Sequence, residues 1–271
     1  MEQNNKMKKA IKELLLRVGL LVLVGNIYSF VLTLKKNAGN NKKFVRDHKH
    51  FPLPPVLIAF DAYGEVDWEN YYNNGLQTAT MIATQINECV KDKENVRIFE
   101  WGCGPGRIIR HLPALMNRTT FEFVGSDYNQ QTIAWCNKYL KGIKFIENNV
   151  GPPLDVEDDT FDFIYCVSVF THLSEKYHPE WLKELLRVLK AGGFLMFTTH
   201  GDNFSTHLHS KDLDDYNAGK LVVWDRSKEG KRDFTAFHSP RYIREQLLAG
   251  QTITKFIESG IGQDIWIVQK Q

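Results

Sequence analysis

The chain has 271 residues, of which 43% are hydrophobic and 12% aromatic, and its formal net charge is +2 at pH 7. This length and composition suit one large α/β domain with extensions, and they exclude an unstructured chain. The four cysteines are scattered singly, without a C-x-x-C pair, which excludes a disulfide framework and the usual zinc spacings. We therefore expect a reducing, cytoplasmic setting and no metal site.

The positive charge is concentrated in a leader at residues 1–50. This segment holds eleven Lys and Arg and three Asp and Glu, a net charge of 11 − 3 = +8, so the rest of the chain carries 2 − 8 = −6. A basic leader on an acidic body favours contact with an anionic surface. The body has no basic stripe, so the charge pattern does not indicate a nucleic-acid enzyme, and we expect no nucleic-acid partner.

Residues 18–34 form an uncharged run of seventeen residues with basic residues on both sides. That length is the lower limit for crossing a bilayer, and glycine and polar residues dilute the run. Three arrangements stay open: a helix packed on the domain, a helix lying on a membrane, and a spanning helix. A secretory signal is disfavoured because Lys35 and Lys36 follow the run in place of a cleavage site.

A proline-rich stretch at residues 51–55 stiffens the chain and predicts a boundary, with the leader at 1–50 and one domain at 51–271. Residues 67–90 predict a helix with one apolar face, formed by Ala79, Ile82, Ala83 and Ile86.

Residues 96–107 are the most informative stretch, an apolar run that leads into Gly102, Gly104 and Gly106. The pattern predicts a buried parallel strand, a turn, and a helix over residues 107–115. Glycines allow positive φ and close approach of a ligand, and the helix N-terminus offers free N–H groups. From these residues alone, a plain strand–turn–helix remains the alternative.

The spacing of these glycines separates two classes of nucleotide-like ligand. A dinucleotide fold requires G-x-G-x-x-G, whereas this chain has G-x-G-x-G with Glu100 just before it. That arrangement resembles motif I of the class I S-adenosylmethionine-dependent methyltransferases. The resemblance implies S-adenosyl-L-methionine as the cofactor, held near Glu100, Gly102, Cys103, Gly104 and Gly106.

A second predicted strand, residues 121–127, ends in Asp127 about twenty residues beyond the last motif glycine, where a ribose diol is expected. Asp127 could instead cap the following helix, a role that Asn129 could also fill. Tyr128 would offer an aromatic face to adenine. After a third strand at residues 143–148, Asn149 and Val150 are placed by the resemblance at the adenine edge. An Asx-turn at Asn149 is the alternative.

The remaining elements are a fourth strand at 161–167, a helix at 179–189 ended by residues 190–193, a fifth strand at 194–198, and a hairpin at 252–259 and 264–268. Val167, at the end of the fourth strand, is expected to contact the cofactor. The run from Pro152 to Gly201 is similar to the type 11/12 methyltransferase domains, which often accompany bacterial surface-glycan biosynthesis. This resemblance implies an α/β fold: a Rossmann-like, seven-stranded, mostly parallel sheet with helices on both faces and an antiparallel C-terminal hairpin.

Methyl transfer needs few catalytic groups, because the sulfonium methyl is already activated and the acceptor needs a base only if it is a hydroxyl. His172 and His200 follow central strands and are the candidate bases, although each could be a cap or a buried structural histidine. A long polar insert at residues 200–238 is expected to shape the acceptor site. Its His207 and His209 are not expected to bind a metal.

We therefore predict a transferase that methylates a small-molecule, sugar or glycolipid acceptor, with a hydroxyl as the accepting group. The alternatives are a catalytically idle S-adenosylmethionine-binding partner and a Rossmann-type NAD-dependent reductase, against which the glycine spacing argues. We expect a cytoplasmic enzyme at the inner face of the membrane, with peripheral contact through the leader.

Overall fold

The computed structural model describes residues 21–91, 93–116 and 120–271, so the first three residues of the uncharged run lie outside it. The chain forms two compact units, which divide at Tyr71 and Tyr72.

The first unit holds α2 (Leu21–Asp47), α3 (Val56–Tyr63) and the start of α4 (Trp68–Cys89). α2 continues through the basic segment because three polar side chains, spaced four residues apart, bind the backbone around Val66. Thr33 Oγ1 accepts from Val66 N at 3.0 Å, and Asn37 and Asn41 donate to Val66 O at 3.2 and 2.8 Å. Across the described ranges, no helix has the length and apolar character that a membrane crossing requires.

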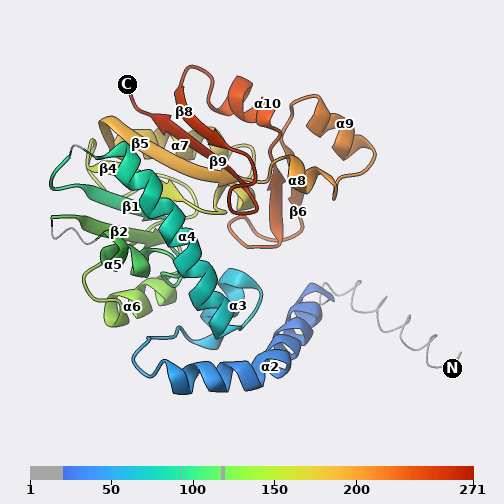
Figure 1. The fold of residues 1–271 in the computed structure, drawn as a ribbon. Helices are drawn as coiled ribbons and strands as arrows, with labels where there is room; N and C mark the ends of the chain where they lie inside the picture. Colours follow the sequence, from blue (N-terminus) through green and yellow to red (C-terminus); the bar gives the residue numbers. More distant parts are fainter. Residues whose placement is uncertain (1–20, 92, 117–119) are drawn as a thin grey trace, which may run out of the picture. The chain divides into compact units, whose positions relative to one another are not determined.

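The second unit is built on a seven-stranded sheet in the order β3-β2-β1-β4-β5-β9-β8 (Figure 1). Its strands are β1 (Arg97–Trp101), β2 (Glu122–Asp127), β3 (Lys144–Glu147), β4 (Phe161–Cys166), β5 (Leu189–Thr199), β8 (Thr252–Ile257) and β9 (Asp264–Gln269). The first five run parallel, and β9 pairs antiparallel with both β5 and β8. The fold class predicted from the sequence is confirmed, including the C-terminal hairpin.

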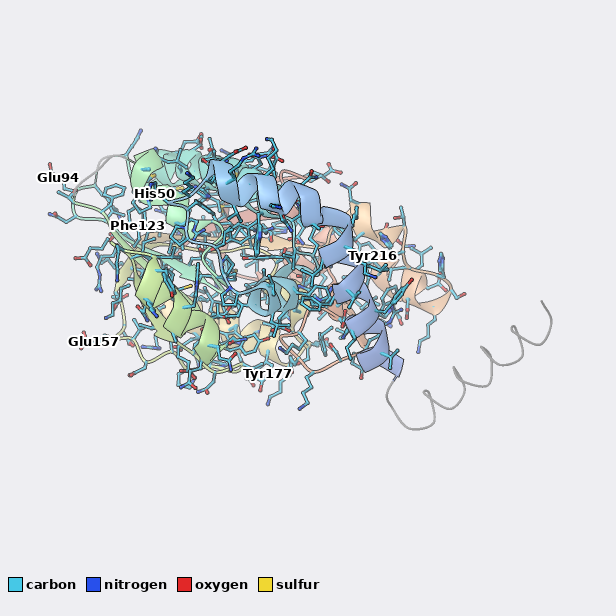
Figure 2. The ribbon with its side chains drawn as sticks, turned by 90° about the horizontal axis from the view of Figure 1, so that it is seen from below. His50, Glu94, Phe123, Glu157, Tyr177 and Tyr216 are labelled. Atoms are coloured by element: carbon cyan, nitrogen blue, oxygen red, sulfur yellow. The ribbon has the colours of Figure 1, made fainter. Side chains whose placement is uncertain are left out.

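Helices cover this sheet and enclose an aromatic core. α6 (Gln130–Tyr139) packs beside β2 and β3, and α7 (Tyr177–Val188) packs beside β5. Phe99 stacks on Phe161 with ring centroids 4.6 Å apart, and Trp101 lies against Trp181 at 4.3 Å. Figure 2 shows side chains filling the space between the ribbons. Every residue of β4 is buried, as expected for a central parallel strand.

The segment after the glycine turn departs from the predicted helix at 107–115. The chain stays in turns up to Ile108, then forms one 3-10 turn, η1 (Ile109–His111), and the short helix α5 (Leu112–Met116). Positive φ at Gly106 and a bond from Ile109 N to Glu100 Oε2 hold this compact path. β5 also begins earlier than predicted, at Leu189, with a register shift against β4 and positive φ at Gly192.

The insert at residues 200–238 has secondary structure of its own, which its polar sequence did not indicate. It contains α8 (Asp202–Ser205), α9 (Lys211–Asn217) and a two-stranded sheet of β6 (Val222–Asp225) and β7 (Phe234–Phe237), drawn in orange in Figure 1. Widely spaced apolar residues form its own small core, a pattern that periodicity does not reveal: Leu208, Tyr216, Val222 and Phe237. α10 (Pro240–Tyr242) and the π-helical turn η3 (Ile243–Leu247) lead on to β8.

Substitution by alanine is expected to have opposite effects on the free energy of unfolding at two glycines that lie in helices. At Gly75 in α4 a Cβ would lie 2.4 Å from the backbone oxygen of Arg107, whereas at Gly39 in α2 nothing lies within 4 Å. Gly75→Ala should lower the free energy of unfolding by about 1–3 kcal/mol through overpacking. Gly39→Ala should raise it by about 0.5–1 kcal/mol, since Ala is the better helix former. Urea denaturation checks both, and equal shifts of the two variants would contradict the prediction.

Candidate cofactor and acceptor site

The predicted site residues gather at the carboxyl edge of the parallel strands, where ligands of open α/β sheets bind. They lie at the end of a strand or directly after it: β1 (Glu100, Gly102, Cys103, Gly104, Gly106), β2 (Asp127, Tyr128), β3 (Asn149, Val150), β4 (Val167, His172) and β5 (His200).

The glycine turn has positive φ at each motif glycine: +73° at Gly102, +50° at Gly104 and +66° at Gly106. A Cβ at Gly102 would lie 2.4 Å from Val169, and one at Gly106 would lie 2.5 Å from Leu140. Two of the three glycines are therefore required by close packing of the protein itself, in addition to their backbone conformation.

Asp127 joins the turns that follow β1 and β2. Its Oδ2 accepts from Gly104 N at 3.0 Å, and its Oδ1 accepts from Asn129 N at 2.8 Å. Asn129 caps α6, accepting from Thr132 N at 3.1 Å, so the helix-cap alternative for Asp127 is excluded. Cys103 donates its backbone N–H to Ser126 O at 2.7 Å, and its side chain is buried under the turn.

Glu100 lies beneath the turn and is almost completely buried. Its Oε2 accepts from Tyr165 Oη at 3.0 Å and from Ile109 N at 3.2 Å. Burial raises the pKa of this carboxyl to about 8, and these hydrogen bonds oppose the increase. In this structure the carboxyl braces the turn against β4.

The end of β3 presents two asparagines. Asn149, the predicted one, is exposed, and its carbonyl accepts from Asn148 Nδ2 at 2.7 Å. Asn148 Oδ1 is buried and has no hydrogen-bond partner among the residues that the structure describes. Asn148 N donates to Asp127 O at 3.1 Å, which places this unpaired acceptor beside the β2 turn. The sequence does not distinguish the two neighbours, because only the backbone path decides which side chain turns inward.

A segment of the insert, residues 226–233, contacts both halves of this edge. Tyr128 Oη donates to Gly230 O at 3.2 Å, and Gly230 N donates to His172 O at 2.9 Å. Glu229 accepts from Ser174 N. A Cβ at Gly230 would be in ordinary contact with Tyr128 and Val150. This strap, residues 226–233, thus binds Tyr128 and the backbone of His172 and lies near Val150, two of the three predicted adenine contacts and one candidate base.

His172, in the 3-10 turn η2 (Phe170–His172), and His200 are oriented by the same strand. His172 Nδ1 lies 2.7 Å from Phe234 O, and His200 Nδ1 lies 3.1 Å from Ala236 O. A carbonyl can only accept, so each neutral ring carries its proton on Nδ1 and keeps Nε2 as an acceptor. Burial lowers the pKa of His172 and lowers that of His200 to about 4.

Two further histidines, missed in the sequence, support that strand. His178 Nδ1 donates to Ser174 O at 2.7 Å, so its Nε2 accepts from His238 Nε2, also at 2.7 Å. His238 follows β7 directly, and its backbone N donates to His200 O at 2.9 Å. Burial lowers the pKa of His178 to about 4 and that of His238 well below its usual range. Partners sixty residues apart leave no local signal.

Comparison with known proteins identifies the chemistry of this edge. Residues 98–193, from β1 into β5, match the family described as a methyltransferase domain. A phthiotriol/phenolphthiotriol dimycocerosates methyltransferase of Mycobacterium leprae is 24% identical over 224 residues, which cover 76% of this chain and 77% of that protein. The chain is a class I S-adenosylmethionine-dependent methyltransferase. Its cofactor is S-adenosyl-L-methionine.

Other relatives of this methyltransferase extend the comparison. A fatty-acid O-methyltransferase of Mycolicibacterium smegmatis is 29% identical over 147 residues, 54% of this chain and 48% of that protein. The structure of DesVI from Streptomyces venezuelae has a TM-score of 0.51 at 14% identity, covering 76% of this chain and all of that one. A Pyrococcus horikoshii protein has a TM-score of 0.50 at 19% identity, covering 69% and 87%. These two structures share the fold.

Between β4 and β5 the methyltransferase carries a polar group that the sequence did not indicate. Ser168, which has φ +59°, donates from Oγ to Gln263 Oε1 at 3.0 Å, and Thr198 Oγ1 donates to the same oxygen at 2.6 Å. Gln263 belongs to the β8–β9 turn, so the C-terminal hairpin reaches the edge where Val167 follows β4. A left-handed non-glycine residue at such a place is typical of functional sites.

The buried carboxyl of Glu100 predicts a pH dependence of stability. Its pKa is about 8 in the folded protein against an ordinary value of 4.5, so the native state holds the proton more tightly. Stability should therefore fall as pH rises from about 4.5 through about 8. Glu100→Gln keeps the shape without ionising and should remove that part of the decline in urea unfolding. Glu122→Gln, at an exposed position of β2, is the matched control. An unaltered profile in Glu100→Gln would show that the native carboxyl is already ionised.

Proposed function

We propose that this methyltransferase transfers the methyl group to an oxygen of a lipid, sugar or other small-molecule acceptor, with a hydroxyl as the accepting group. The observation that carries the proposal is the pair of imidazoles with acceptor Nε2 atoms, both oriented by alternate carbonyls of β7. The names of two relatives support an oxygen acceptor. One is the fatty-acid O-methyltransferase, and the other is a malonyl-[acyl-carrier protein] O-methyltransferase of Bacillus cereus.

The contacts at the carboxyl edge of the sheet support a specific role for each residue in binding S-adenosylmethionine. Both oxygens of Asp127 hold backbone N–H groups and keep lone pairs that can accept from the ribose hydroxyls. The buried, unpaired Oδ1 of Asn148 fits an amino group of adenine, and we add it to the predicted Asn149 and Val150. Tyr128 would flank the base beneath the strap. The motif glycines and Cys103 would approach through their backbone, and Glu100 would act by bracing the turn. Val167 would contact the methionine end.

The proposed reaction places few demands on the protein. S-adenosylmethionine supplies an electrophilic methyl group on a positively charged sulfur. Nε2 of the base removes the acceptor proton as the acceptor oxygen forms its bond to the methyl carbon, and the electron pair of the broken C–S bond stays on sulfur. We assign the base to His172, because a pKa of about 4 makes His200 a weak proton acceptor at neutral pH. His200 would hold the acceptor by a hydrogen bond.

We also propose the cellular setting that the leader suggests. A basic leader on an acidic body supports peripheral contact with the inner, anionic face of a membrane. A lipid or glycolipid acceptor of surface-glycan biosynthesis would then be met at that surface.

Asp127→Ala should weaken S-adenosylmethionine binding by about 1–3 kcal/mol, because hydrogen bonds to a charged group are lost together with the anchor of Gly104. Isothermal titration calorimetry measures the affinity. Asn129→Ala is the control for the loop, since it removes the α6 cap but no proposed cofactor contact. Unchanged affinity in a folded Asp127→Ala protein would remove the ribose assignment.

His172→Ala should lower turnover by about a hundredfold or more without changing cofactor affinity, because the base is lost while the cofactor edge is intact. His200→Ala is the parallel variant. Full activity of both would leave positioning of the acceptor as the whole mechanism. Nitrogen NMR of the wild-type rings offers a check that needs no acceptor, since both should carry the proton on Nδ1.

The chemical class of the product tests the proposed function directly. Methyl-labelled S-adenosylmethionine is incubated with the enzyme and lipid or glycolipid extracts, and the labelled product is treated with mild alkali. A methyl ether survives this treatment, whereas a methyl ester releases its label. Survival supports a hydroxyl acceptor, release indicates a carboxylate, and label on nitrogen or sulfur would overturn the proposal.

A further inference from the structure

One face of α2 is fixed against its own unit. Asn37 and Phe44 on this face are buried, and Thr33, Asn37 and Asn41 bind the backbone at Val66. Asn41 also accepts from Trp68 N at 2.8 Å. Because these side chains recur at every fourth residue, they set the rotation of the helix about its axis. The opposite face of α2 therefore points outward from this unit.

The first half of the outward face is apolar. Val24, Ile27, Tyr28 and Val31 recur at helical spacing, with relative exposures of 43%, 55%, 65% and 40%, and Leu32 beside them is 46% exposed. Adjacent exposed apolar side chains on one helix face are uncommon on a soluble surface and mark an interaction site.

The second half of the same face is basic. Lys35, Lys42 and Arg46 continue the line of Val31 at helical spacing, and all three are exposed. Asp47, the one acid of α2, pairs with Arg46 at 3.0 Å and with Lys43 at 3.3 Å. No ion pair of Lys35 or Lys42 occurs within the part of the chain that the structure describes, so these charges are available to an anionic partner.

We propose that this outer face of α2, made of Val24, Ile27, Tyr28, Val31, Leu32, Lys35, Lys42 and Arg46, docks on an anionic phospholipid bilayer. The inference rests on the proposed peripheral contact and gives it a defined surface. A bilayer offers both complements in the required order, a shallow apolar layer beneath a layer of negative headgroups. Tyr28 suits the boundary between them, because its ring is apolar and its hydroxyl is polar.

The test uses the full-length protein and flotation with vesicles. Vesicles of phosphatidylglycerol mixed with phosphatidylcholine should bind the protein at low salt and release most of it at high salt, and pure phosphatidylcholine should bind little. The double variant Lys35→Glu and Lys42→Glu should lose about tenfold or more of the binding. Tyr28→Glu should lose a similar share by placing a charge in the apolar half.

Tyr139→Glu is the matched control, since Tyr139 is an exposed tyrosine of α6 in the other unit, and it should bind vesicles like the wild type. Equal binding by wild type and Tyr28→Glu, or no binding to anionic vesicles, would overturn the proposal. A dimer in solution that Tyr28→Glu dissociates would assign the face to a second copy of the chain. Cofactor affinity is measured on the same variants, so loss of vesicle binding at normal affinity separates this surface from the methyl-transfer site.

Discussion

The carboxylate of Asp127 connects the turns after β1 and β2, and the arrangement of the whole cofactor edge depends on it. One oxygen holds Gly104 and the other holds Asn129, while the backbone oxygen of the same residue holds Asn148 after β3. The turn after β1 is packed against the segment after β4 in a different way, because Gly102 has no Cβ and Val169 fills that space. The ends of four strands are thus set relative to one another by the carboxylate and the backbone oxygen of Asp127 and by the absence of a Cβ at Gly102.

The acceptor half of the edge is organised by different contacts. β7 belongs to the insert, and its carbonyls fix the tautomers of His172 and His200. The pair of His178 and His238 ties the end of that strand to α7. All these rings are neutral at physiological pH, because burial disfavours the charged imidazole. The part of the edge proposed for the methyl acceptor is therefore lined by neutral imidazoles.

Much of the sheet could be predicted because its strands are short apolar runs between polar turns, as in Phe161–Cys166. The cofactor could likewise be predicted from the glycine spacing and from Asp127 after the second strand, because both are local sequence patterns. The features that the sequence did not reveal depend on contacts outside these local patterns. The helix expected after the turn is interrupted because Glu100 holds Ile109 from below. α2 continues through its basic segment because asparagines find backbone groups twenty-five or more residues away.

The contrast between local patterns and contacts made by the fold also explains which site residues could be predicted from the sequence. The resemblance places Asn149 at the adenine edge, and its chemistry is identical to that of Asn148. Only the backbone at the end of β3 decides which of the two side-chain oxygens is buried. His238 and Gln263 lie in the insert boundary and a hairpin turn, where no periodicity exists. Their roles follow from contacts with α7 and with Ser168, which the fold brings together across 60 and 95 residues.

Because β7 lies in an insert, the residues at this edge of the sheet come from two different parts of the chain. The proposed cofactor contacts come from the ends of sheet strands and from the turns directly after them. The orientation of both imidazoles comes from a segment that the sheet itself does not need. Exchange of residues 201–238 between related enzymes could therefore alter acceptor preference and base geometry in a single event and leave cofactor recognition unchanged. Such a layout lets new acceptors evolve on an old cofactor site.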